Sequence, residues 1–453
     1  MNEKKFKAKT PICDFVSRYC EKGVSRFHMP GHKGVGVTGC ERLDITEICG
    51  ADVLYSPDGI IEQSEKEATE LFGTAHTFYS AEGSSLVIKA MLALATSGCK
   101  GRKKILAARN AHKAFVYGCA LLDIEIIWLY PQKEFSLCSC PITVQDVKNA
   151  LEKEKDGICA VYLTSPDYLG NIADIKGMAK VCDDFEIPLL VDNAHGAYLK
   201  FLKEDIHPIT LGAFMCCDSA HKTLPVLTGG AYLHISKKAP EKYVQNARNM
   251  LSVFASTSPS YLILQSLDAC NAYLADNFSE KLEKCVDRVS LAKKRISEKG
   301  FVLSGDEGLK IVIDAKKSGY SSFELEKVLR ENLVECEFSD GDFLVLMATS
   351  ENTEEDFLRI EKAFENLESR KPLTEEKLFP TRCEKAMSVK EAIFAPIERI
   401  SAKNAVGRVC GCPAVSCPPA IPIVTSGEII DENAVRLFEK YGIFEIDVVK
   451  HEE

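Results

Sequence analysis

The part of the chain from about residue 74 to residue 240 alternates short apolar runs with segments of helical length. The runs are rich in β-branched residues and predict strands at Lys104–Ala107, Ile124–Leu129, Ile158–Thr164, Ile187–Asp192 and Ala231–Ile235. Helical spacing lies between them, at Ser84–Thr96, Lys113–Leu122, Thr143–Glu154 and Ile175–Phe185. Strands that alternate with helices predict an α/β fold with a mostly parallel sheet, in which ligands bind at the carboxyl ends of strands.

The remainder of the chain differs from this pattern. A long polar helix is expected from about Glu280 to Lys299, and short strands and helices follow it, which is typical of a smaller α+β region. We therefore predict an N-terminal segment at 1–45, a large α/β domain at 46–280 and a small α+β region at 281–453.

Composition excludes some classes of function. With 453 residues and a formal charge of −10, the chain shows no basic face for nucleic acid. No run is long enough to span a membrane, and the charged N-terminus leads into no apolar signal segment. We expect a cytoplasmic protein whose 19 cysteines are reduced thiols. Cys410, Cys412 and Cys417 lack a second pair at zinc spacing, so we expect no metal.

Lys222 is the residue most indicative of chemistry. It follows Ser219-Ala220-His221 near the end of an apolar run, where its amine could hold a carbonyl cofactor as a Schiff base. Asp192 ends the preceding predicted strand, and His195 follows it by three residues. An aspartate at one strand end and a lysine after the next strand is the arrangement that pyridoxal phosphate requires, because the carboxylate keeps the pyridine nitrogen protonated.

Other polar groups fall at the same predicted edge. Ser84 and Ser85 follow Gly83 at a helix start, which suits a phosphate but also a plain helix cap. His112 follows a strand end, where an imidazole can stack on a flat ring or make a structural hydrogen bond. Thr257 lies in a hydroxyl-rich stretch that could equally be a turn.

Taken together, these motifs resemble the ornithine/lysine/arginine decarboxylases, fold type I pyridoxal phosphate enzymes with the aspartate-aminotransferase fold. The match is to the short bacterial branch without an N-terminal wing, and its members that act on arginine are the most similar. The motifs are Phe27–Gly34, Asp44–Glu47, Arg109–Lys113, Asp192–Gly196, Ser219–Lys222, Ser256–Tyr261, Pro418–Pro422 and Gly427-Glu428.

The resemblance implies roles for individual residues. Lys222 would link to the cofactor, Asp192 would contact the pyridine nitrogen with His195 nearby, and His112 would stack on the ring. The expected phosphate ligands are Gly83, Ser84, Ser85, Ser219 and His221, with Thr257 reaching the phosphate of a neighbouring subunit. Glu82 departs from the family's phosphate loop and would be unfavourable beside a phosphate unless it points away.

The resemblance also implies an activity. We expect decarboxylation of a basic amino acid, with arginine favoured over lysine or ornithine, to a polyamine-type amine and CO2 in a homodimer or larger homo-oligomer. Asp167 and Glu428 are candidate substrate contacts, because a carboxylate can pair with a distal cation. His32 is a third candidate, because its Pro-Gly-His-Lys loop would border the shared site. Two alternatives stay open: another reaction of the same fold, such as transamination or elimination, and a non-catalytic homologue that binds the cofactor.

Overall fold

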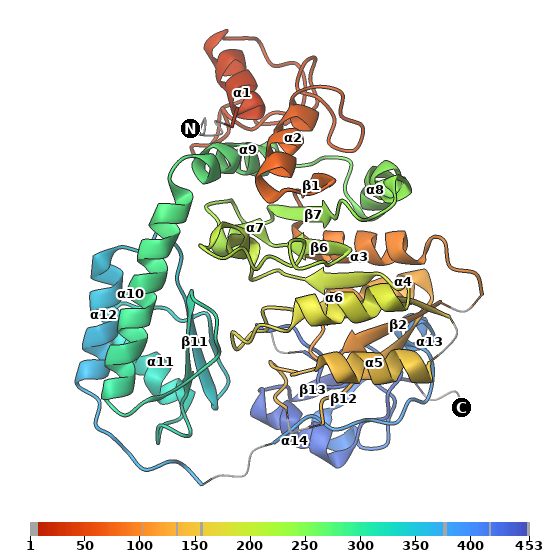
Figure 1. Ribbon diagram of the computed structural model, residues 1–453, viewed down its shortest axis with the longest axis vertical. Coiled ribbons are helices and arrows are strands. Elements are labelled where there is room, and N and C mark those ends of the chain that lie inside the picture. The colour runs from red at the N-terminus through yellow and green to blue at the C-terminus, as the bar shows by residue number, and fades with distance from the viewer. Residues whose placement is uncertain are drawn as a thin grey trace. The chain divides into compact units, whose positions relative to one another are not determined.

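The computed structural model describes residues 8–101, 103–132, 135–154, 157–374, 378–415 and 418–450. The chain forms two compact units, each assembled from two separate stretches (Figure 1). The first unit contains Met1–Cys99 and Ile175–Lys281, and the second contains Lys100–Asp174 and Leu282–Glu453. The two units neither confirm nor contradict the predicted domain boundaries at residues 45 and 280, so these boundaries stay a prediction.

The first unit is built on four strands in the order β1-β7-β6-β5. Their bounds are β1 His76–Ser80, β5 Leu189–Asp192, β6 Met215–Asp218 and β7 Ala231–Ile235. β5 and β6 are parallel, whereas β7 runs antiparallel to both β6 and β1. Its helices are α1 Pro11–Glu21, α2 Ile60–Phe72, α3 Gly83–Thr96, α6 Ile175–Asp184, η1 Ala197–Phe201, α7 Ala220–Thr223, α8 Glu241–Phe254 and α9 Tyr261–Ala275.

The second unit contains three parallel strands in the order β4-β2-β3, with bounds β2 Lys103–Ala108, β3 Ile124–Leu129 and β4 Ile158–Thr164. A four-stranded antiparallel sheet has the order β10-β11-β9-β8, and β12 pairs with β13. The remaining strands are β8 Val302–Ser304, β9 Lys310–Asp314, β10 Phe338–Ser339, β11 Phe343–Met347, β12 Ile397–Ser401 and β13 Glu445–Val449.

The first helices of the second unit alternate with its three parallel strands along the chain. They are α4 Lys113–Leu122, α5 Val144–Lys153, α10 Phe278–Glu298, α11 Ser322–Glu331, α12 Glu354–Glu365, α13 Val389–Phe394, η2 Ala402–Asn404 and α14 Glu432–Lys440. α10 begins at the end of the first unit. α11 packs on β11 and beside α12, so the smaller sheet has a helical layer on one face (Figure 1).

The predicted α/β fold class is confirmed, because the main sheet has seven strands and is mostly parallel. The five predicted strands and four predicted helices of residues 74–240 are all present, with ends that differ by at most two residues. The alternation did not predict β1, and it did not identify β6 as a separate strand. β1 pairs only with β7 and antiparallel to it, so it lies outside the repeating β/α pattern.

Burial explains why these apolar runs form the core. β5, β6 and β7 are buried at every position, and ten of the fourteen residues of α3 are buried. α3 packs against α8, β6 and β7 (Figure 1). Removing such side chains from water is the main favourable contribution to folding, at roughly 25 cal/mol per Å² of apolar surface. The buried strands therefore provide a rigid support for the polar residues that follow them.

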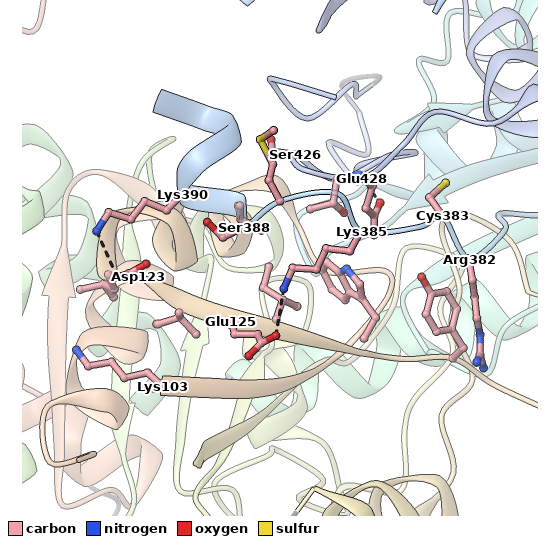
Figure 2. Close-up of a pocket in the computed structure, with 18 of the residues that line it drawn as sticks. Lys103, Asp123, Glu125, Arg382, Cys383, Lys385, Ser388, Lys390, Ser426 and Glu428 are labelled. Carbon is pink, nitrogen blue, oxygen red and sulfur yellow. Dashed lines mark hydrogen bonds and ion pairs between the residues drawn. The ribbon is translucent and has the colours of Figure 1, made fainter. Parts of the chain in front are cut away.

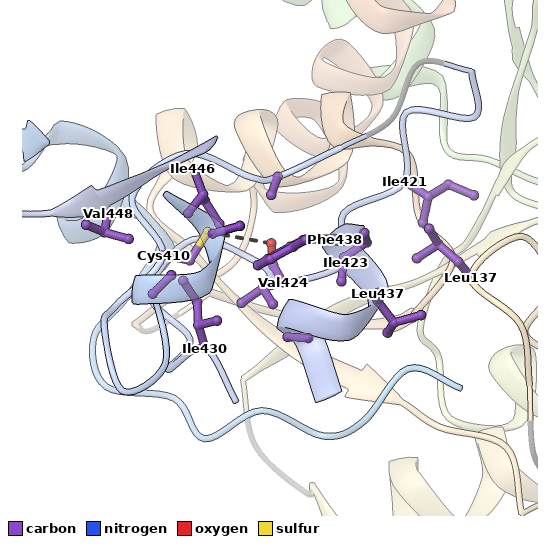
Figure 3. Packing of buried hydrophobic residues seen from close by; sticks show 14 residues of the cluster. Leu137, Cys410, Ile421, Ile423, Val424, Ile430, Leu437, Phe438, Ile446 and Val448 are labelled. Carbon is purple, nitrogen blue, oxygen red and sulfur yellow. Dashed lines mark hydrogen bonds between the residues drawn. The ribbon is translucent and has the colours of Figure 1, made fainter. Parts of the chain in front are cut away.

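A second core stabilises the C-terminal part of the second unit. Cys410 belongs to this cluster, which includes Val424, Ile430, Phe438 and Val448 (Figure 3). Its thiol donates to the carbonyl of Cys412, and burial raises its pKa above the usual value. Cys410 thus packs as a small apolar residue. Cys417 lies outside the described residues.

The thiol state differs from the expectation at two positions. Among the residues that the structure describes, sixteen cysteines carry free thiols. Cys99 and Cys159 are disulfide-bonded, so the expectation of reduced thiols is wrong for these two residues. Their sequence spacing carries no signal of a disulfide, because a pairing depends on the fold. In the part of the chain described, no helix is both long enough and apolar enough to cross a membrane.

Candidate active site

Lys222 and His195 meet at the ends of two neighbouring parallel strands. His195 follows β5, and Lys222 lies on the short helix α7 that begins two residues after β6 ends. Lys222 Nζ lies 2.8 Å from His195 Nε2. His195 is only 5% exposed, so this contact is largely shielded from water. A shielded amine beside an imidazole can exchange a proton with it, as a nucleophilic lysine requires.

Asp192 is fixed at the end of β5 in the same unit. It is 2% exposed, and its Oδ1 accepts hydrogen bonds from the backbone N–H of Ala194 at 3.2 Å and the thiol of Cys217 at 3.5 Å. Asp192 pairs in register with Cys217 on β6. Both strands therefore hold this carboxylate, and its position varies little.

The start of α3 forms a cluster of hydrogen-bond donors with the end of β6. Ser219 Oγ donates to Ser84 Oγ at 2.8 Å, and Ser219 is buried. Gly83 has φ +72°, a left-handed conformation that favours glycine, and a Cβ there would meet nothing within 4 Å. No side chain caps this helix start, and although the N–H of Gly83 donates to Gly229 O at 2.7 Å, the N–H groups that follow it in the first turn can bind an anion. Ser85 is exposed on the same first turn.

His221 and Thr257 differ in their surroundings. His221 Nδ1 lies 3.0 Å from the carbonyl oxygen of Gly230, and burial lowers the pKa of its imidazole. Thr257 is exposed in the loop before α9. Glu82 turns toward that loop, because its Oε1 accepts the N–H of Ser256 at 2.8 Å. This hydrogen bond resolves the conflict that the sequence raised at Glu82.

In the second unit, the motif around His112 meets the C-terminal proline motif. His112 is the N-cap of α4, and its Nδ1 accepts the N–H of Ala114 at 3.1 Å. The N–H of Lys113 donates to Ala420 O at 2.9 Å. Arg109, which is 2% exposed, donates to the carbonyls of Pro422 and Ile423, both at 2.8 Å. The stacking of His112 on a cofactor ring stays a prediction.

Glu428 borders a cavity of about 510 Å³ that lies within the second unit (Figure 2). Trp128, Tyr130 and Ser426 also line it. Glu428 Oε2 lies 3.7 Å from Arg109 Nη2 and accepts the N–H of Thr425 at 2.7 Å. Among the described residues both contacts use Oε2, so Oε1 remains available to an added hydrogen-bond donor.

In the described part of the chain, four cationic side chains line this cavity, Lys103, Arg382, Lys385 and Lys390. Lys385 pairs with Glu125 at 3.1 Å, and Lys390 pairs with Asp123 at 3.3 Å (Figure 2). Arg382 lies over the ring of Tyr130, 4.5 Å from its centre. Each of these carboxylates therefore has a cationic partner, Lys385 for Glu125, Lys390 for Asp123 and Arg109 for Glu428, and the pair at Glu428 has the longest separation, 3.7 Å.

The other two predicted substrate residues are already engaged. Asp167 is 5% exposed and accepts hydrogen bonds from the backbone and side-chain nitrogens of Asn171, with oxygen–nitrogen distances of 2.9 Å in each case. Burial raises the pKa of Asp167. His32 Nε2 lies 3.2 Å from Asp44 Oδ2 in the N-terminal loop of the first unit. A substrate contact by Asp167 would require a change in this hydrogen bonding.

Sequence reasoning missed a group of buried residues around Asp218. His207, His234 and Asn193 all lie within 3.1 Å of its carboxylate oxygens. The only sequence signal was an acidic residue at the end of an apolar run. The two histidines carried none, because their proximity to Asp218 depends on strand pairing.

The chemistry of these donors fits pyridoxal phosphate. The first unit combines an amine, a buried carboxylate and a cluster of hydroxyl and backbone N–H donors, which are the groups that an aldehyde, a protonated ring nitrogen and a phosphate each require. The open space at Gly83 leaves room for a ligand to approach the helix start. The fold and this site define an aspartate-aminotransferase-like enzyme of fold type I.

Comparison with known proteins identifies the family. Residues 10–327 match the family described as Orn/Lys/Arg decarboxylase, major domain, so the chain belongs to the Orn/Lys/Arg decarboxylases. It is therefore a decarboxylase by family. The predicted resemblance is confirmed.

Individual relatives agree with this assignment. An arginine decarboxylase of Bacillus subtilis is 29% identical over 94% of this chain and 92% of its own length. One of Bacillus anthracis is 28% identical over 95% of this chain and 92% of its own length. The solved constitutive lysine decarboxylase of E. coli has a TM-score of 0.78 and 16% identity, covering 98% of this chain and 82% of its own. That likeness concerns the fold alone.

Proposed function

We propose that this protein decarboxylates arginine, using pyridoxal phosphate bound through Lys222. The observation that carries the proposal is the 2.8 Å contact of Lys222 Nζ with His195 Nε2, at a strand-end site that also holds Asp192. The family membership and the names of the two Bacillus relatives support arginine.

The proposed roles follow from the chemistry of each group. When bound, the cofactor accepts the electron pair that is released as the bond from Cα to the carboxylate breaks. Lys222 holds the cofactor, and Asp192 keeps a proton on its ring nitrogen. His112 stacks on the ring, and His195 exchanges a proton with Lys222. The proposed phosphate ligands are Gly83, Ser84, Ser85, Ser219 and His221, with Thr257 from a second subunit.

Substrate choice is proposed to depend on Glu428. A guanidinium is planar and stacks on aromatic faces, whereas an ammonium is a compact point charge, so a carboxylate beside aromatic walls suits arginine better. Trp128 and Tyr130 provide these walls in the same cavity. His32 and Asp167 remain the alternative contacts. A homodimer, a cytoplasmic location and a polyamine-type amine product are part of the same proposal.

The experiment that tests the activity is release of CO2 from arginine, lysine and ornithine with added pyridoxal phosphate. We expect wild type to act fastest on arginine and Lys222→Ala to be inactive on all three substrates. An exposed lysine variant, Lys66→Ala, is the control that removes an amine far along the sequence from the site. No CO2 from any of the three would contradict the proposal, and amino-group transfer without CO2 would favour an aminotransferase.

The role of Glu428 requires a separate comparison. Glu428→Gln should reduce kcat/KM for arginine about tenfold more than for lysine, which corresponds to ~1.4 kcal/mol of transition-state binding. Glu125→Gln, the same change at a carboxylate of the same cavity that pairs with Lys385, provides the matched control. Equal losses on all three substrates would show that Glu428 does not bind the distal group.

A further inference from the structure

Asp218 ends β6 four residues before Lys222 and is fully buried. Its Oδ2 accepts from His207 Nε2 at 3.0 Å and from His234 Nε2 at 3.1 Å. Its Oδ1 accepts from Asn193 Nδ2 at 2.7 Å. All four residues have 0% exposure, so these hydrogen bonds do not compete with water.

The two histidines determine the charge on this carboxylate. Burial alone would raise the pKa of Asp218, but His207 and His234 reverse that effect and hold it well below its usual range. Burial lowers the pKa of His234, and Asp218 opposes that shift. Thr77 on β1 also belongs to this hydrogen-bonded group, because its Oγ1 lies 2.9 Å from His234 Nδ1.

His207, Cys216 and Asp218 are also close enough together to raise the question of a metal. The hydrogen bonding favours a network without one. The N–H of Ile209 donates to His207 Nδ1 at 3.4 Å, which puts the proton of a neutral His207 on Nε2, toward Asp218. A metal ligand would need that nitrogen deprotonated.

Asn193 links this network to the candidate active site. It follows Asp192 directly, and its backbone carbonyl accepts the N–H of Gly196 at 2.8 Å, which closes the turn that contains His195. A Cβ at position 196 would lie 2.0 Å from Asn193 Oδ1. The Asn193 side chain therefore lies between Asp218 and Gly196, and the absence of a Cβ at position 196 leaves room for it.

We propose that Asp218 is a positioning residue, which through Asn193 fixes the turn that holds His195 against Lys222. The two strand ends that supply the amine and the imidazole are thereby connected by a buried, ionised carboxylate. The inference rests on the proposed function only in treating the Lys222–His195 pair as the reactive one.

The reactivity of Lys222 in the full-length, cofactor-free chain tests this inference. Asp218→Asn, Asn193→Ala and the double variant are acetylated with acetic anhydride across a range of pH, and the rate at Lys222 is followed by peptide mass spectrometry. We expect each single variant to change the Lys222 rate at least fivefold, relative to the other lysines, and the double variant to add nothing further, because both residues act in one chain of contacts.

Asp268→Asn is the matched control, since Asp268 is another fully buried carboxylate of the first unit. It should leave the Lys222 rate at the wild-type value. An unchanged rate in Asn193→Ala, or additive effects in the double variant, would overturn the inference. Stoichiometric metal in wild type that is lost in Asp218→Asn would also overturn it. Because labelling needs neither cofactor nor turnover, these outcomes are independent of the proposed reaction.

Discussion

Asp192 offers the most direct test at the scale of single residues. Asp192→Asn keeps the shape of the side chain and its acceptor oxygen but removes the charge that would hold a proton on the cofactor ring. We expect the cofactor to remain bound and kcat to fall about a thousandfold, or ~4 kcal/mol in barrier. Steady-state CO2 release and the visible absorption of the bound cofactor are the two measurements.

A charge change elsewhere in the unit controls for this variant. Asp205→Asn removes a carboxylate that pairs with Lys200 at 2.6 Å, and it should leave kcat within about twofold of wild type. If Asp192→Asn retained wild-type turnover, the assignment of Asp192 to the ring nitrogen would be wrong.

At the scale of elements, Asp268 on α9 connects two other helices. It accepts the N–H of Cys13 on α1 at 2.8 Å and the hydroxyl of Ser64 on α2 at 2.5 Å. Burial raises its pKa from 3.8 to about 6. A carboxyl whose pKa is raised by folding contributes stability that is complete below its unfolded pKa and lost as pH rises through the folded pKa.

The packing of α1, α2 and α9 should therefore depend on pH between about 4 and 6. Relative to Asp268→Asn, the free energy of unfolding of wild type should increase by about 2 kcal/mol as pH falls from 7 to 4. Urea unfolding at several pH values measures this difference. Asp184→Asn, at an exposed position, should show no such dependence. A constant difference between wild type and Asp268→Asn would contradict the raised pKa.

At the scale of the whole molecule, the proposed active unit is a homodimer with shared sites. Thr257 is exposed, and Glu82 holds the neighbouring Ser256. Because Thr257 is proposed to act on the second subunit's phosphate, mixing Lys222→Ala with Thr257→Ala chains should create hybrid dimers with one intact site. An equal mixture should recover roughly a quarter of wild-type activity.

The control for this mixture is each inactive variant mixed with itself, which should recover nothing. Differently tagged chains and affinity capture establish that hybrids form. Hybrids that form without recovering activity would mean that each chain builds its site alone.

The sequence by itself determined the fold class and the order of the motifs. β-branched runs that alternate with helical periods define strands and helices through local propensity, which explains why β3 has its predicted bounds. Lys222, Asp192 and His112 were predicted as site residues because each lies at or after a strand end, and the carboxyl ends of parallel strands carry ligands. The antiparallel β1 was missed because a strand outside the β/α repeat has no such periodic context.

The tertiary structure alone decided which polar groups meet. Asn193 follows β5, Asp218 ends β6 and His234 lies within β7, and the packing of these buried strands brings the three within hydrogen-bond distance. Arg109 contacts the carbonyls of Pro422 and Ile423, more than 300 residues later in the chain. Such contacts leave no periodic trace in sequence, because burial and strand pairing, rather than local propensity, determine the partners of a polar side chain.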